Sequence, residues 1–474
     1  MSAPDDAAAP REPVRGFSRA FWTANVVELL ERGAWYGVFV AITLYLSRVL
    51  AYSDIEAATV SGIFSAGLYL LPTFSGAWAD RIGFRRALLL AFALLTLGYG
   101  GMWLLPTLIE SAGLAHYGRE VEFTGLQHSG TRWLFVPVMM FVMVGGSFIK
   151  SVITGTVAHE TTPSTRARGY SIFYAMVNIG SFGGKTIVQP LREQLGNAGL
   201  VVLNLYAAGM TALALVLVLV FYRSQSHGSG KSMAEIRRAL VAVMSRGRLV
   251  VLILIITGFW MVQYQLYASM PKYVLRMAGE DSAPSWYANV NPAVVVLTVG
   301  AVTSLMRGRT ALRSMTVGMF IMPISALCMA AGNLVGRDLI AGMQPVAFMM
   351  VVGIAFQGLA ESFISPRYLE YFSLQAPKGE EGLYLGFAHL HSFLAALLGF
   401  VTSGFLLQRY CPDPATLSPA EQAARLEALA GRGEMPAAYA QAHHLWYVFV
   451  AVALVSAIAL VVYGRVGAPR DRAD

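Results

Sequence analysis

Twelve long apolar segments constrain the fold of this chain more than any other feature of its sequence. Each is close to the roughly 20 residues that an α-helix needs to cross a bilayer. Only 13% of the 474 residues are charged, whereas soluble domains carry about a quarter. The sequence therefore predicts an all-α polytopic membrane protein with helices near 20–47, 57–78, 86–105, 133–157, 168–191, 200–222, 248–275, 286–306, 313–333, 343–373, 382–407 and 444–464.

Basic residues are concentrated in the loops on one side of these helices. Because basic loops stay in the cytoplasm, we expect both termini there. The net charge of +8 is explained by these loops, and no nucleic-acid partner is expected. The arginines concerned are Arg81, Arg85, Arg86, Arg166, Arg168, Arg237, Arg238, Arg307, Arg309 and Arg313.

A polar segment at residues 223–247 separates the first six helices from the last six. We predict an N-terminal bundle at 19–222 and a C-terminal bundle at 248–467, with cytoplasmic tails at 1–18 and 468–474. The linker is expected to contain a short basic helix. Two six-helix halves joined in this way resemble the major facilitator superfamily, in which the halves are related by an axis along the membrane normal.

The loop after the second helix strengthens this resemblance. Residues 76–86 read GAWADRIGFRR, which is similar to the superfamily's signature between its second and third helices. Glycines permit a tight turn there, and Asp80 is able to pair with Arg81 or Arg85 across helix ends. The sequence thus predicts a cytoplasmic gate at these three residues.

Charged residues also occur inside the predicted helices. The first helix carries Glu28, Glu31 and Arg32, with Glu28 and Arg32 one turn apart on the same stripe. Lys150 and Glu361 lie at comparable depth in the fourth and tenth helices. A charge that faces lipid costs about 3 kcal/mol or more, so these side chains are expected to face protein or water. A buried carboxylate beside a movable cation is able to bind and release a proton, which is the physical requirement for proton coupling.

Three further polar residues within helices receive a structural interpretation. Lys185, in the outer part of the fifth helix, is expected to snorkel or to pair locally. His389 and His391 are two residues apart in the eleventh helix, so they are expected to point to different faces. At most one of them is then able to line a central cavity.

The whole pattern resembles the proton-dependent oligopeptide transporter family, a branch of the major facilitator superfamily. Residues 28–36 resemble that family's ExxERxxYY motif, and FYAMVNIGSF at 173–182 is similar to its second signature, FYxxINxGSL. The matches keep the family's order through both halves. The remaining ones are Tyr69, Pro72 and Gly76, then 284–292, 361–366, 376–378 and Gly386.

The resemblance implies a role for each matching residue. Proton coupling is implied for Glu28, Glu31, Arg32, Lys150 and Glu361. Glu361 would also hold a peptide's amino group, while Arg32 and Lys150 would face its carboxylate. Substrate contacts are further implied for Tyr36, Tyr69, Asn178, Trp260, Gln263 and Asn291.

The sequence departs from the family pattern around the pocket and its gate. Trp35 replaces the first tyrosine of a pair, and Gly33 replaces the usual phenylalanine. The seventh helix reads FWMVQYQ at 259–265, without the acidic residue that would close the outer gate against Arg32. The eleventh has FAH at 387–389 where the family often has a tryptophan. These departures bear on the substrate more than on the mechanism.

We predict a proton-coupled symporter that imports di- and tripeptides by alternating access. The alternatives are a transporter of the same fold for another organic solute, such as an amino-acid derivative, an organic anion or a drug, and a non-transporting membrane sensor. No enzymatic activity, metal or cofactor is expected, since the sequence shows no metal-spacing cluster, phosphate-binding glycine loop or nucleophile motif. The expected partners are protons, a short peptide and the lipid of a bacterial inner membrane, and we expect a monomer.

Overall fold

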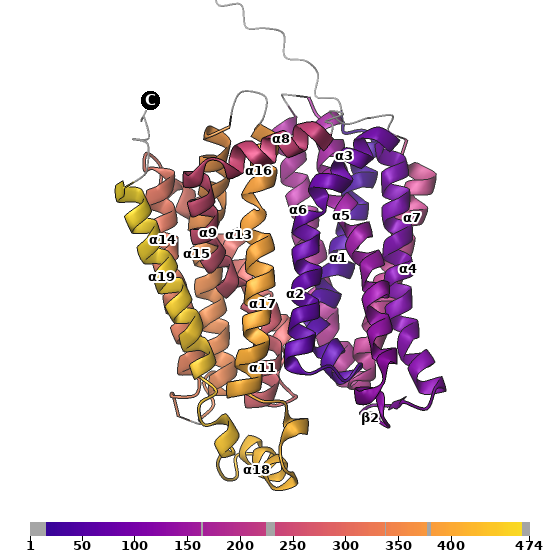
Figure 1. Ribbon diagram of the computed structural model, residues 1–474, viewed down its shortest axis with the longest axis vertical. Coiled ribbons are helices and arrows are strands. Elements are labelled where there is room, and N and C mark those ends of the chain that lie inside the picture. The colour runs from indigo at the N-terminus through magenta and orange to yellow at the C-terminus, as the bar shows by residue number, and fades with distance from the viewer. Residues whose placement is uncertain (1–15, 163–164, 224–232, 337, 377–380, 467–474) are drawn as a thin grey trace, which may run out of the picture.

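Helices make up almost all of the regular structure of the chain. The computed structural model describes residues 16–162, 165–223, 233–336, 338–376 and 381–466. Most of the expected tails at 1–18 and 468–474 therefore lies outside the described residues, as do 224–232 of the linker and 377–378 of the family motif. The all-α membrane fold predicted from the apolar segments is confirmed (Figure 1).

The helices form two groups that stand side by side (Figure 1). The N-terminal half contains α1 Arg19–Arg48, α2 Asp54–Leu70, α3 Pro72–Ile82, α4 Phe84–Ser111, α5 Phe135–His159, α6 Arg166–Leu195 and α7 Ala198–Phe221. The C-terminal half contains α9 Gly247–Gln263, α10 Gln265–Ala268, α11 Met270–Ala278, α12 Pro284–Tyr287, α13 Val290–Leu305, α14 Ala311–Ala331, α15 Pro345–Leu374, α16 Glu381–Ala388, α17 Leu390–Tyr410 and α19 His444–Val466.

Two opposite faces of the molecule are marked by smaller elements (Figure 1). On one face, α8 Met233–Met244 lies against α3 and α16 and confirms the short basic helix expected in the linker. On the other lies α18 Pro419–Leu429, which begins with a capping box between Ser418 and Glu421. We call these the α8 face and the α18 face. The α18 face also carries the antiparallel strands β1 Ala115–Tyr117 and β2 Val121–Phe123. Within the described ranges, 3₁₀ turns lie at Leu126–His128, Gly130–Leu134, Pro414–Thr416 and Ala437–Tyr439.

The number of helices that are able to cross a membrane agrees with the sequence. Within the described ranges, nine are long and apolar enough, or ten when the bent pair α2 and α3 counts as one. The helices α1 and α6 are 30 residues each, about 45 Å in length, and carry the buried charges that lower their hydropathy. Adding these two to the ten gives the twelve predicted spans.

Four spans that were expected as single helices are interrupted. The second bends by 46° between α2 and α3, where Pro72 begins the new helix. The seventh consists of α9, α10 and α11, with Pro271 in the first turn of α11, and the eleventh is broken at His389. The eighth is divided between α12, which ends at Tyr287, and α13, which begins at Val290. Proline lacks the backbone N–H that a continuous helix requires, which explains the first break and the last break of the seventh span.

The helices α1 and α6 approach each other through small residues. Gly33 and Gly37 on α1 face Gly180 and Gly184 on α6, and a Cβ on Gly37 would lie 3.0 Å from the Gly184 carbonyl oxygen. Glycines spaced four apart on both helices permit backbone-to-backbone packing. This explains why Gly33 stands where the family has phenylalanine, and it brings α6 close to the charged stripe of α1.

Candidate functional site

Glu28, Glu31 and Arg32 of α1 form one cluster, which we call the inner cluster. Arg32 Nε lies 3.1 Å from Glu28 Oε1, and Arg32 Nη2 lies 2.5 Å from Glu31 Oε2. Both glutamates are 2% exposed. One guanidinium thus serves two carboxylates, and one negative charge remains without compensation inside the cluster.

Lys150 of α5 lies near this cluster without joining it. Its side chain is exposed although it stands in the middle of a membrane helix, and among the described residues its ammonium group has no hydrogen bond or ion pair. Its charge nevertheless acts on Glu28 and Arg32, and on His389 and His391 of the other half. Lys150 is therefore exposed on α5 at a position from which its charge acts on residues of both halves.

Glu361 of α15 faces the same region from the C-terminal half. Its Oε2 accepts a hydrogen bond from Gln263 Nε2 at 2.8 Å and from Asn291 Nδ2 at 3.4 Å. The structure thus brings together three residues that the sequence assigned to the site from three different helices. Amide donors hold the Glu361 carboxylate in place. Among the described residues, no cation lies within ion-pair distance of it.

Trp260 and the two histidines form a ring cluster in the C-terminal half. The Trp260 ring lies 5.5 Å from the ring of His391, which is buried and packs edge-on against Tyr368 at 4.9 Å. The rings of His389 and His391 lie only 6.0 Å apart. The expectation that they point to different faces is wrong because the helix is interrupted at His389, so the spacing rule for a continuous helix does not apply.

The remaining predicted contacts occupy different surroundings. Tyr69 lies on α2 and faces Tyr264, with ring centres 6.1 Å apart. Asn178 of α6 donates its amide to the Tyr174 carbonyl of its own helix at 2.8 Å. Trp35 stacks on neighbouring aromatic rings of the N-terminal half rather than facing the inner cluster. The substrate contacts implied for Tyr69 and Asn178 stay predictions.

Lys185 of α6 does not snorkel, so of the two expectations from sequence the structure favours local contacts. It is 2% exposed, and no carboxylate within the described ranges pairs with it. Its ammonium nitrogen lies 5.0 Å from the Tyr36 ring centre and 5.9 Å from that of Tyr267, and it donates to the Ala288 carbonyl at 3.4 Å. The close packing of α6 on α1 directs this lysine inward, toward the site.

On the α8 face, residues of both halves line a cavity. This cavity of about 420 Å³ lies between α2, α3, α8, α16 and α17, and Tyr69 is part of its wall. Between described residues, no ion pair joins the two halves on this face. Gly83, at φ +85°, makes the predicted tight turn between α3 and α4, while Arg85 donates to the Leu219 carbonyl of its own half at 3.0 Å. The gate role of Asp80, Arg81 and Arg85 stays a prediction.

The α18 face is closed by a network of four charged residues, which we call the latch. Asp54 of α2 accepts from Lys272 at 2.8 Å and, through both oxygens, from Arg276 at 2.8 and 2.9 Å. Arg276 also binds Asp413 at 2.7 Å. Burial alone would raise the pKa of Asp413, but Arg276 and the backbone N–H of Ala415 hold it below its ordinary value. Because Asp54 belongs to one half and the cations to the other, the latch holds the halves together.

A second ion network strengthens the closure of this face. Glu280, between α11 and α12, binds Arg48 of α1 at 2.6 Å and Arg192 of α6 at 2.9 Å. Burial opposes the ionisation of Glu280, yet both arginines lower its pKa below the ordinary value. This network also joins the two halves.

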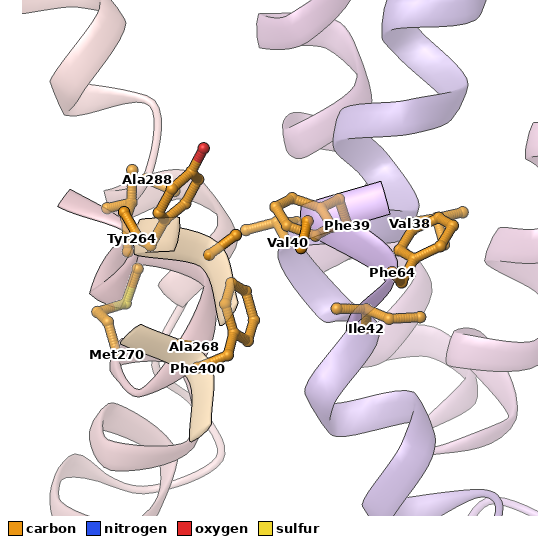
Figure 2. Packing of buried hydrophobic residues seen from close by; sticks show 14 of the residues in the cluster. Val38, Phe39, Val40, Ile42, Phe64, Tyr264, Ala268, Met270, Ala288 and Phe400 are labelled. Atoms are coloured by element: carbon orange, nitrogen blue, oxygen red, sulfur yellow. The ribbon is translucent and has the colours of Figure 1, made fainter. Parts of the chain in front are cut away.

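An apolar layer lies between these ion networks and the inner cluster. Phe39 of α1 packs against Tyr267 and Phe400 of the C-terminal half, with ring centres 4.9 and 6.0 Å apart. Figure 2 shows Phe39 and Val40 on the side of α1 that faces Phe400, whereas Val38 faces Phe64 within the N-terminal half. The α18 face is therefore sealed by both apolar packing and ion pairs.

The latch was not predicted from the sequence. Lys272 and Arg276 are spaced four apart, so they share a face of α11, and this spacing near the end of an apolar span was the available signal. Asp54 lies more than 200 positions earlier. The missing acid of the seventh helix is thus replaced by contacts in which the seventh span supplies the cations and α2 supplies the acid.

Comparison with known sequences places these features in context. The family model described as Major Facilitator Superfamily matches residues 26–337. The chain is 24% identical to dipeptide and tripeptide permease B of Photorhabdus asymbiotica over 82% of its own length and 87% of the relative. It is 22% identical to dipeptide and tripeptide permease A of Proteus mirabilis, over 84% and 88%.

Solved structures share the fold. A structure concerned with substrate recognition in proton-dependent oligopeptide transporters aligns with a TM-score of 0.66 at 18% identity, covering 94% of this chain and 99% of the other. A transporter of the same family in complex with 5-aminolevulinic acid aligns with a TM-score of 0.68 at 17% identity, over 96% and 98%. These comparisons confirm the resemblance predicted from the motifs.

Proposed function

The chain belongs to the major facilitator superfamily, and we propose that it is a proton-coupled symporter that imports di- and tripeptides. One observation carries this proposal. The inner cluster has one uncompensated negative charge, and two separate charged groups, a cation and an anion, face the same region. Lys150 lies on one side and Glu361 on the other. A zwitterionic peptide needs a cation for its carboxylate and an anion for its ammonium group. The names of the curated relatives support the peptide class.

The orientation follows from the basic residues on the α8 face, which we assign to the cytoplasm. The α18 face then lies outside, and both termini lie inside, in the inner membrane of a bacterium. With the outer face closed and the cavity of about 420 Å³ on the inner face, the structure represents the inward-facing state of an alternating-access cycle.

The geometry of the inner cluster suggests how the proton takes part. In the outward-facing state, a proton from outside neutralises Glu28 or Glu31, and Arg32 then remains paired with the other carboxylate alone. The extra positive charge, together with Lys150, favours the carboxylate of an incoming peptide. Opening to the cytoplasm exposes the cluster, so the proton leaves, the ion pairs of Arg32 re-form and the peptide carboxylate is released.

Uptake into proteoliposomes tests this proposal. An inward proton gradient is expected to stimulate uptake of a dipeptide such as Ala-Ala, and Glu31→Gln or Lys150→Ala is expected to reduce uptake to that of protein-free liposomes. Glu427→Gln is the matched control, because Glu427 forms an exposed pair with Arg432 on the α18 face. Uptake of none of a varied set of small peptides would reject the proposal.

A second cargo class requires the same assay because the sequence departs from the family pattern around Trp260 and His389, and Trp260 packs against the ring of His391 at 5.5 Å. A transporter of this fold has been solved with 5-aminolevulinic acid, so a non-peptide amino acid derivative is the alternative solute. A thermal-shift panel of dipeptides, tripeptides and amino acids separates the two classes, since a ligand that binds only the folded state raises the melting temperature by mass action. A larger shift with a non-peptide ligand would favour the alternative. We further propose a monomer, although one neighbour was solved as a tetramer.

A further inference from the structure

Lys185 is a buried cation that the proposed transport cycle does not yet use. It extends from α6 toward the outer end of the site, behind the rings of Tyr36 and Tyr267. An ammonium group carries three donors, and here a single carbonyl, that of Ala288, accepts at the long distance of 3.4 Å. The aromatic faces supply a weaker attraction of about 0.5–2 kcal/mol. The Glu361 carboxylate attracts this ammonium group without an ion pair. Burial of an ammonium group with so few hydrogen-bond partners is costly, and Lys185 therefore keeps donors for a further acceptor.

The partners of Lys185 belong to both halves of the molecule. Tyr36 is on α1, which packs with α6 in the N-terminal half, whereas Tyr267 and Ala288 belong to the C-terminal half. When the halves separate on the outer face, Lys185 must lose its contacts with Tyr267 and Ala288. Only Tyr36 then stays beside it. The ammonium group is therefore presented to the outer vestibule in the state that receives the ligand.

The net charge of the site indicates which ligand Lys185 would bind. Three carboxylates and three cations surround the space between the halves, so the site without a bound proton is neutral when the histidines are uncharged. Binding the coupled proton gives it a net charge of plus one. A zwitterionic peptide leaves that charge in place, whereas a ligand with one extra carboxylate cancels it. The groups are Glu28, Glu31, Glu361, Arg32, Lys150 and Lys185.

Neutrality matters because the loaded site must pass through a closed state. A net charge enclosed in a low-dielectric interior is penalised far more than a balanced set of charges. Without Lys185, the site would have no net charge after binding the coupled proton and a zwitterionic peptide. With Lys185 present, the closed site is neutral when the bound ligand carries a net charge of minus one.

We propose that Lys185 is a specificity-determining residue that binds a second carboxylate of the ligand, so that the chain prefers peptides with an acidic side chain. The inference rests on the proposed peptide transport and deepens it. The acidic side chain would meet Lys185 beside Tyr36 as the outer face closes. The peptide's own termini would remain with Lys150 and Glu361.

Competition between isosteric peptides tests this. Ala-Glu and Ala-Gln differ by one charge and hardly in shape, so the ratio of their half-inhibitory concentrations against Ala-Ala uptake reports recognition of the carboxylate. A hydrogen bond to a charged group contributes about 1.5–3 kcal/mol, and 1.4 kcal/mol is a factor of ten. We expect wild type to favour Ala-Glu by about tenfold or more, Lys185→Gln to bring the ratio to about one, and Lys185→Arg to retain the preference. Because the ratio is taken within each variant, the amount of folded protein cancels.

Each outcome has one meaning. A wild-type ratio of one, with Ala-Ala transported normally, would overturn the inference and leave the proposed function standing. Transport of no peptide would overturn both. A preference for Ala-Glu that persists in Lys185→Gln would show that Lys185 has only a structural role. Should Lys185→Gln fail to fold, Lys185→Met takes its place, because it also removes the charge and is likewise expected to bring the ratio to about one.

Discussion

The latch and the inner cluster are both buried groups of charges, but they are satisfied to different degrees. In the latch, Asp54 receives three hydrogen bonds from two cations, and Arg276 divides its donors between Asp54, Asp413 and the Cys411 carbonyl. In the inner cluster, two carboxylates share one guanidinium, and the second oxygen of Glu28 has no donor within the described part of the chain.

This difference separates a group of charges that fixes a state from one that is able to change. A buried ion network is stable when every donor and acceptor has a partner, and the latch meets this condition only while the halves are closed on the α18 face. The inner cluster leaves capacity for a proton and a ligand. The latch is therefore suited to hold one conformation, whereas the inner cluster is suited to respond to a proton and a ligand.

Removing Asp54 should have the largest effect on stability. Asp54→Ala leaves Lys272 and Arg276 buried with one fewer anion, and loss of one member of a buried ion pair costs about 3–5 kcal/mol. We expect a clear fall in the melting temperature of purified protein. Glu427→Ala is the control, since its pair with Arg432 is exposed and such pairs contribute little. Equal effects of the two variants would remove the distinction between latch and surface.

Removing Lys150 should weaken ligand binding without lowering the stability of the protein. Its ammonium group has no ion pair among the described residues, so Lys150→Ala is expected to leave the melting temperature unchanged or slightly higher. Dipeptide affinity, measured by thermal shift or calorimetry, is expected to fall about tenfold or more because a hydrogen bond to a charge is lost. A loss of stability as large as that of Asp54→Ala would contradict the comparison.

The pH dependence of the latch should be the smallest effect. The pKa of Asp413 is lowered in the folded state, so its stabilisation is present above its ordinary pKa of about 3.9 and is lost as the pH falls through the lowered value. The difference in melting temperature between wild type and Asp413→Asn is therefore expected to be small, because 35% of the Asp413 side chain is exposed, and constant from pH 5 to pH 8. A difference that changes within this window would make the latch a proton sensor.

The sequence predicted the inner cluster because charges in the middle of an apolar helix are conspicuous. Glu28, Glu31 and Arg32 are close in the chain, so helical spacing alone brings them together. Glu361 with Gln263 and Asn291 came from the family resemblance, and the structure brings these three into contact.

The latch could not be predicted in the same way. Asp54, Lys272 and Arg276 lie near helix ends, where charges are ordinary, and their pairing depends on how the two halves meet. The inward direction of Lys185 was not predicted, for a related reason. It follows from the glycine contact between α1 and α6, which no local pattern of charge or hydropathy reports.

Proton movement measured inside proteoliposomes tests the central claim most directly, namely that the incompletely satisfied inner cluster carries the coupled proton. With a pH-sensitive dye in the lumen and no imposed gradient, adding Ala-Ala outside wild-type vesicles should acidify the lumen. Glu31→Gln vesicles should show no acidification, while Glu427→Gln vesicles should behave as wild type. Peptide uptake by wild type without acidification, or acidification that persists in Glu31→Gln, would contradict the account.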